Sequence, residues 1–126
     1  MKLVFYSQQR ERFPDTFLIF CTDDQAVFIA RAVADHFGFV LPPIIFWNRS
    51  YGEASDSAFN IPHDPNLGGL IHELAHVKDF NDLIERDRRE GRDFQHPRKM
   101  HCKRLMAIIE EIYDFCKQND FFLKDL

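Results

Sequence analysis

Residues 72–76 have the sequence His-Glu-Leu-Ala-His, and this pentapeptide constrains the fold more than any other stretch of the chain. Helix positions four apart lie on one face, so His72 and His76 can direct two imidazoles at one metal ion. Glu73 follows the first histidine, where a carboxylate can act on a water molecule held by that ion. The pattern predicts a helix that carries two metal ligands and a general base.

The residues on either side of this motif predict a central helix over about 65–83. Asp64 is the expected N-cap, and Pro65 suits the first helical position. Apolar side chains occur on more than one face of the helix, which is typical of a buried helix. They are Leu67, Leu70, Ile71, Leu74, Val77 and Phe80. Gly68 and Gly69 each lower helix propensity by about 1 kcal/mol, which indicates close packing or a substrate backbone passing nearby.

The remaining elements predict an α+β fold, with a small mixed or antiparallel sheet packed on helices. Strands are expected at 2–7, 44–48 and 55–61, and helices at 23–37, 65–83 and 98–117. Strands 44–48 and 55–61 are expected to form a hairpin with an irregular loop. The helix at 23–37 has an expected capping box at Thr22 and Gln25 and a stop at Gly38.

Composition limits the class of protein. The 126 residues are 45% hydrophobic and 29% charged, which predicts one globular domain over residues 1–126. The aromatic residues of the tail, 119–123, are expected to pack back on the core. The three cysteines include no Cys-x-x-Cys, so neither a zinc ribbon nor a disulfide framework is indicated. Without a signal peptide or a run of ~20 apolar residues, the expected location is cytoplasmic, with no membrane partner.

The charge pattern allows nucleic-acid binding only locally. The formal net charge of −4 gives the whole molecule no general attraction to nucleic acid. Arginines and lysines are concentrated within residues 86–104, in a run that also contains acidic residues. A solvated helix end and loop is the simpler interpretation of this run, and a local basic patch is the alternative.

A third ligand is needed, because two imidazoles bind zinc weakly and catalytic zinc has three protein ligands and an open position. The candidates are His96, His101 and carboxylates such as Glu110 or Glu111. If the last helix begins near residue 98, its period places His101 on the apolar face, one turn before Leu105. His101 is therefore favoured. His96 stays open as the alternative, because it can turn its side chain inward at the helix start. His63, before the motif helix, is expected to be an exposed turn residue.

At this point the chain resembles a known family. A strand ending in Ala58-Phe59-Asn60-Ile61-Pro62, followed by a spacer and Gly69-Leu70-Ile71-His72-Glu73-Leu74-Ala75-His76, is similar to SprT-like zinc metallopeptidases of the minimal gluzincin type. Within that family the chain especially resembles small stand-alone actinobacterial and phage metallohydrolases.

The resemblance implies a zincin-like fold, Zn²⁺ as cofactor, His72 and His76 as ligands, Glu73 as general base and a third histidine from a later helix. The chain departs from the family there, because neither His96 nor His101 is followed by the family's glycine and aromatic residue. It also has no zinc ribbon or basic tail, so DNA–protein crosslink repair is not implied.

The expected function is therefore a zinc-dependent hydrolase, a metallopeptidase that cleaves peptide bonds with a water activated by Glu73. An extended peptide or protein substrate is expected to pair with the strand over 55–61. Tyr51 is a candidate for stabilising the oxyanion, although a packing or surface tyrosine is the simpler interpretation. The alternative is a non-catalytic zincin-fold module that binds protein or nucleic acid. Glu73 argues against this alternative, because a purely structural metal site needs no carboxylate there.

Overall fold

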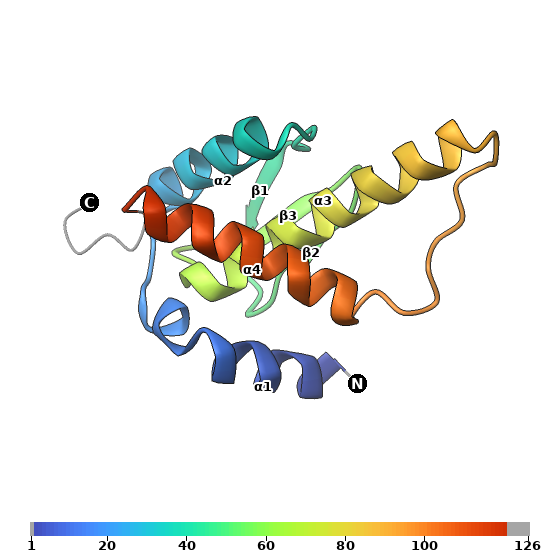
Figure 1. Cartoon of the computed structure of the whole chain (residues 1–126). Coiled ribbons are helices and arrows are strands. Elements are labelled where there is room, and N and C mark those ends of the chain that lie inside the picture. Colours follow the sequence, from blue (N-terminus) through green and yellow to red (C-terminus); the bar gives the residue numbers. More distant parts are fainter. Residues whose placement is uncertain (1, 121–126) are drawn as a thin grey trace.

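The computed structural model describes residues 2–120, and this part of the chain has an α+β fold (Figure 1). Its helices are α1 (Lys2–Arg12), the 3-10 helix η1 (Pro14–Leu18), α2 (Asp23–Phe37), α3 (Leu67–Arg89) and α4 (Lys103–Gln118). Its strands are β1 (Ile44–Trp47), β2 (Glu53–Ala54) and β3 (Phe59–Pro62). The α+β class is the predicted one.

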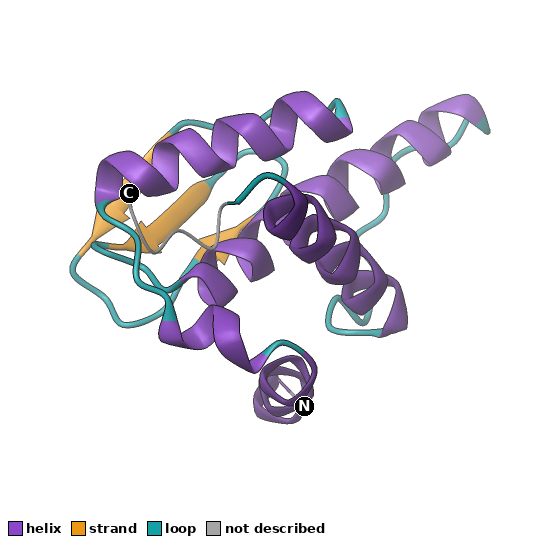
Figure 2. Ribbon diagram, turned by 60° about the vertical axis from the view of Figure 1, so that its left-hand side comes forward, coloured by secondary structure: helices purple, strands orange, loops and turns teal. Residues whose placement is uncertain are grey.

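Helix α3 lies at the centre, in contact with α2, α4, η1 and the sheet (Figures 1 and 2). Every residue from Leu70 to Val77 is buried, as the apolar pattern predicts. The helix begins later than predicted, because the Asn66 side chain caps it by accepting a hydrogen bond from the Gly69 amide at 2.7 Å. Asp64 instead adopts a positive φ of 47° and donates its own amide to Asp23. The predicted N-cap at Asp64 is wrong, and α3 runs on to Arg89.

The predicted strand at 2–7 is wrong, since these residues belong to helix α1. Phe5, Gln9 and Phe13 are buried at four-residue spacing, so one face of α1 and the turn after it packs against the rest of the protein. Six residues rich in β-formers are too short to establish a period, and tertiary packing overrides their propensity.

The sheet is mixed, with the strand order β1-β3-β2. Strands β1 and β3 pair in parallel, with Ile44 opposite Phe59 and Trp47 opposite Pro62, whereas β2 pairs antiparallel with β3. The predicted hairpin between 44–48 and 55–61 is therefore wrong. Residues 55–58 form a turn instead, closed by a 2.9 Å hydrogen bond from the Ser55 amide to the Ala58 carbonyl. Strand β3 is central, and β2 forms the edge next to α3.

The flanking helices agree in part with prediction. In α2 the capping box of Thr22 and Gln25 is present, and Gly38 ends the helix in the left-handed conformation at φ 71°. Helix α4 begins at Lys103 rather than at residue 98, so the segment from Gly91 to Cys102 is a connecting loop. The predicted packing of residues 121–123 falls outside the described residues.

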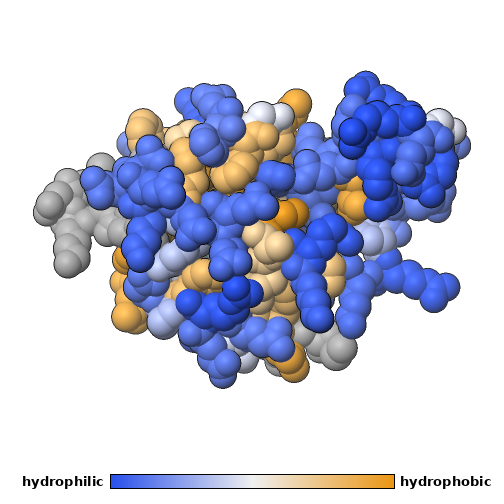
Figure 3. All heavy atoms as spheres, viewed as in Figure 1, coloured by the Kyte–Doolittle hydropathy of each residue, from blue (hydrophilic) through white to orange (hydrophobic). Residues whose placement is uncertain are grey.

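The surface is uneven in polarity. In Figure 3 hydrophilic residues gather at the end of the molecule where the last turns of α3 lie. Within residues 2–120, none of the helices combines the length and apolar character that crossing a membrane requires.

Candidate metal centre

Three histidines from two distant segments converge in the structure. The Nε2 atoms of His72, His76 and His101 lie 3.2 Å from one another in all three pairs. The centre of such a triangle is about 1.8 Å from each nitrogen, and zinc–nitrogen bonds are about 2.0–2.1 Å long. One ion slightly out of the plane of the three nitrogens is therefore within bonding distance of each. These residues are close enough to bind a metal ion.

Gln9 fixes the protonation of His72. Its Nε2 donates to the Gly68 carbonyl at 3.0 Å, and because a carbonyl only accepts, the amide orientation is set. Its Oε1 then faces the Nδ1 atom of His72 at 2.8 Å and accepts the proton there. In the neutral ring the lone pair is left on Nε2, which faces the other histidines. Outer hydrogen bonds of this kind orient metal-binding histidines.

Aromatic residues of α1 hold the histidine rings from the outside. The ring of Tyr6 is stacked on His72, with centroids 4.2 Å apart and planes at 17°. Phe5 presents an edge-on contact to His72 and to His101, at 5.6 and 5.2 Å. Because α1 also supplies Gln9, one helix surrounds His72 on two sides and contacts His101.

Glu73 is buried beside the same cavity. Its carboxylate accepts a hydrogen bond from the Tyr6 hydroxyl, and burial, the negative charge of Glu73 and this hydrogen bond together raise the pKa of Tyr6. Gly52, next to the edge strand β2, makes room for it, since a Cβ there would lie 2.7 Å from the Glu73 Cγ. Any larger residue at position 52 would displace the glutamate.

An ion pair between a buried carboxylate and a part-exposed arginine joins the two segments that carry the histidines. Asp79, one turn after His76, accepts hydrogen bonds from Nε and Nη2 of Arg104 at 2.6 and 3.0 Å. Arg104 is three residues after His101, in the first turn of α4. Such a two-bond contact restricts orientation as well as distance. It fixes the start of α4, and with it His101, against α3.

His96, His63 and Tyr51 do not line the cavity in front of the three histidines. His96 is exposed, with its ring against Phe80 and Phe94 at 5.5 and 4.9 Å. His63 is exposed, as predicted, and its Nδ1 lies 2.6 Å from Asp23. The hydroxyl of Tyr51 accepts a hydrogen bond from Arg49 at 2.6 Å. Neither His96 nor His63 is part of the cluster.

The structure places His101 in the cluster for a reason that differs from the predicted one. The residue lies in the loop before α4, so no helical face positions it. Tyr6 and Gln9 were missed altogether, because Tyr6 was placed in the predicted strand 2–7 and Gln9 lay outside every predicted element. The four-residue spacing of Phe5, Gln9 and Phe13 is the signal that would have placed them on a buried helical face.

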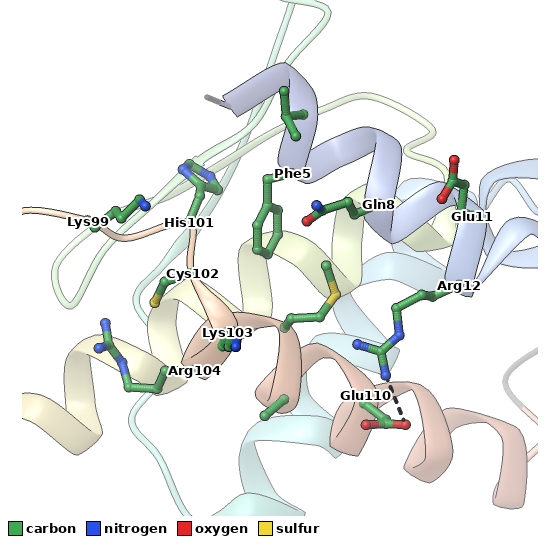
Figure 4. Close-up of a pocket in the computed structure, with 13 residues that line it drawn as sticks. Phe5, Gln8, Glu11, Arg12, Lys99, His101, Cys102, Lys103, Arg104 and Glu110 are labelled. Carbon is green, nitrogen blue, oxygen red and sulfur yellow. Dashed lines mark ion pairs between the residues drawn. The ribbon is translucent and has the colours of Figure 1, made fainter.

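Three hollows meet at this centre. The metal cavity, of about 290 Å³, is lined by the three histidines, Glu73 and residues of β2. A cavity of about 470 Å³ shares Tyr6, Gly52 and Glu73 with it. A larger groove, of about 920 Å³ between α1 and α4, shares only His101 (Figure 4).

Comparisons of the chain with protein-family models, curated proteins and solved structures gave no match. The resemblance to SprT-like metallopeptidases therefore stays a prediction, and the function is argued below from the site alone.

Proposed function

We propose that the protein is a zinc-dependent peptidase. The observation that carries this proposal is the convergence of three histidine Nε2 atoms at 3.2 Å beside the buried carboxylate of Glu73. Three imidazoles with a cavity in front of them suit zinc in a catalytic site, where one coordination position stays open. A bound zinc ion would act as a Lewis acid on a carbonyl group and lower the pKa of a water molecule.

Glu73 is the proposed general base. In the hydrolysis, the water oxygen bonds to the carbonyl carbon and the carbon–nitrogen bond breaks. Glu73 takes one proton from the water and delivers it to the departing amine, so the products are a carboxylic acid and an amine. The hydroxyl of Tyr6, which donates to Glu73, keeps this carboxylate in place.

An extended peptide has a suitable position at the sheet. Strand β2 is an edge strand, and Glu53, Ala54 and Ser55 line the metal cavity. A peptide can add to such an edge through main-chain hydrogen bonds. The expectation that 55–61 would be that edge is wrong, because β3 is paired on both sides at Phe59 and Asn60.

The alternative of a nucleic-acid-binding module gains little from the structure. Arg86 and Arg92 contact Asp87, and Arg88 contacts Glu85 at 2.7 Å. The positive charge at the start of 86–104 is thus partly balanced by nearby carboxylates.

The test is Glu73→Gln in protein loaded with zinc. Bound zinc should be retained, while hydrolysis of a peptide library falls by about 10²–10⁴-fold, the range for loss of a general base. Glu85→Gln makes the same chemical change on an exposed turn of α3 and should keep full activity. Undiminished hydrolysis in Glu73→Gln would remove Glu73 from this role. Purified protein that takes up no zinc would contradict the proposal as a whole.

A further inference from the structure

The cavity next to Glu73 has the form of a side-chain subsite. It has a volume of about 470 Å³ and opens beside the metal cavity, with which it shares Tyr6, Gly52 and Glu73. Cavities of this size are ordinary for specific small-ligand sites. A molecule held at the histidines can therefore extend into it without leaving the protein surface.

The walls of this cavity are largely apolar and come from distant segments. They are formed by Phe17, Tyr51, Ile61, Pro62 and Pro65. Ile61 and Pro65 are buried and Phe17 is half-buried, packed against Gly68 so closely that a Cβ there would lie 2.8 Å from its ring. Rigid apolar walls favour a large apolar side chain over a small or charged one.

Arg10 places one positive charge at this cavity. Arg10 of α1 is exposed, and its guanidinium carbon lies 5.0 Å from the centroid of the Phe17 ring. Among residues 2–120 it is the only positively charged residue that lines the cavity, and it forms no ion pair with a carboxylate of this part of the chain. Contact with the ring restricts the guanidinium, and a restricted guanidinium binds carboxylates well.

The position of Glu73 indicates which side of the scissile bond faces this cavity. A base that passes a proton to the departing amine must lie on the amine side of the scissile bond. Glu73 lines this cavity and none of the three histidines does, so the cavity lies on the Glu73 side of the metal site, where the residue whose nitrogen departs would place its side chain. We propose that this cavity binds a large apolar side chain on the amine side of the bond, and that Arg10 binds a carboxylate just beyond it.

Two sources can supply that carboxylate, the C-terminus of the substrate or an acidic side chain. The first describes an enzyme that removes residues from a C-terminal end, and the second an enzyme that cuts before an apolar–acidic pair. The proposal rests on the proposed peptidase activity for its direction, but binding of a cleaved product tests it without any hydrolysis.

The groove between α1 and α4 is the weaker candidate, although it is larger. Figure 4 shows Arg12 of α1 reaching Glu110 of α4, an ion pair of 3.2 Å that neutralises both groups. The groove also carries Glu11 opposite its lysines and meets the metal cavity only at His101. Its charges of both signs select no single ligand.

The experiment measures dissociation constants of product-like peptides for zinc-loaded wild-type protein by NMR titration. The probes are Phe-Ala, Phe-Ala-amide, Phe-Asp-amide and Ala-Ala, so that the ring, the terminal carboxylate and a side-chain carboxylate are varied separately. The same series is run on Arg10→Gln. Arg12→Gln is the matched control, because it makes the same change two residues along α1 at the other groove.

We expect Phe-Ala to bind at least about tenfold more tightly than Phe-Ala-amide, as for loss of one charged hydrogen-bonded contact. This ratio should fall to about one in Arg10→Gln and persist in Arg12→Gln. Phe-Asp-amide that binds as tightly as Phe-Ala supports the site and extends it to acidic side chains. Phe-Asp-amide that binds like Phe-Ala-amide supports the site and assigns it to a chain terminus.

Three results would overturn the inference: no detectable binding of Phe-Ala, a ratio that Arg10→Gln leaves unchanged, or equal binding of Ala-Ala and Phe-Ala. The second result would mean that zinc, not Arg10, holds the carboxylate. Failure of the proposed function would be recognised by a different measurement: zinc-loaded wild-type protein would hydrolyse none of the peptides in a library.

Discussion

The two halves of α3 lie in opposite environments. From Leu67 to Phe80 almost every side chain is buried, whereas from Asn81 to Arg89 only Leu83 and Asp87 are. The first half carries His72, Glu73 and His76, and the second half lies at the hydrophilic end of the molecule (Figure 3). One continuous helix therefore has a half with the histidines of the cluster inside the fold and a charged half outside it.

The polar side chains of the two halves find their hydrogen-bond and ion-pair partners at different distances along the sequence. In the buried half each partner comes from a distant segment: Gln9 for His72, Tyr6 for Glu73 and Arg104 for Asp79. In the exposed half Arg88 pairs with Glu85, three residues away, and Asp87 pairs with its neighbour Arg86. Buried polar groups need such partners because desolvation is costly, while exposed pairs contribute little. Four predictions test this contrast.

The largest effect is expected from His101→Ala. Loss of one of three ligands should weaken zinc binding by more than the roughly 10–100-fold that outer hydrogen-bond partners contribute. Competition with a zinc-binding dye measures the dissociation constant. His96→Ala is the matched control and should leave it unchanged, since His96 is outside the cluster. If His96→Ala weakened zinc binding and His101→Ala did not, the third ligand would be His96.

A smaller effect, on stability, is expected from Asp79→Asn. Hydrogen bonds to charged groups contribute about 1.5–3 kcal/mol, and the part-exposed Arg104 places Asp79→Asn near the lower end of that range. Urea unfolding of the zinc-free protein gives the free energy of unfolding. Asp82→Asn, which changes an exposed carboxylate paired with Lys78, should cost less than about 1 kcal/mol. Equal costs would show that burial of the Asp79 carboxylate adds nothing to the strength of its pair.

Gln9→Ala should weaken zinc binding by about 10–100-fold without unfolding the protein. The reason is that His72 loses the acceptor that holds its Nδ1 proton and ring orientation. Gln8→Ala, at the neighbouring exposed position, serves as the control and should bind zinc like wild type. The measurement is the dye competition above, with circular dichroism as the check on folding. An unchanged zinc affinity would contradict the role given to Gln9.

The most local effect, on a single backbone amide, is expected from Asp87→Asn, a buried carboxylate in the otherwise exposed half. Burial alone would raise the pKa of Asp87, but hydrogen bonds from the Gln95 amide and Arg86, together with the charges of Arg86 and Arg92, lower it overall. A lowered pKa in the folded state adds stability at neutral pH that is lost as the pH falls through that pKa. Wild-type protein should therefore lose protection of the Gln95 amide from hydrogen exchange in acid. The variant should show weaker protection that does not depend on pH in this range.

The sequence predicted what local patterns determine. The capping box at Thr22 and the stop at Gly38 depend on neighbouring residues, and both are confirmed. The apolar residues around His72 correctly predicted a buried helix, because burial on several faces needs no knowledge of the partners. The structure also brings His101 to the motif histidines, although the helix assumed in that argument begins only at Lys103.

The predictions that were wrong concern features that depend on contacts between distant residues. Strand β1 was predicted nearly correctly and β3 only from residue 59 onward, but their parallel pairing is decided by the whole chain path and not by their sequences. Residues 2–7 of helix α1 were predicted as a strand, because so short a run of β-forming residues shows no period and its packing against α3 is not visible in the sequence. Tyr6 and Gln9 were lost with it, so the surroundings of the metal centre were the least predictable part.

The hydrogen bond between Gln9 and His72 spans 63 positions of the sequence, and the contact between His72 and His101 spans 29 more. During synthesis the motif helix is thus present, with its two histidines and its glutamate, well before the third imidazole emerges from the ribosome. Since metal sites of this kind form only with the folded state, a nascent chain that ends before residue 101 lacks the complete three-histidine cluster. The order of synthesis therefore delays completion of the metal site until the segment that leads into α4 has been made.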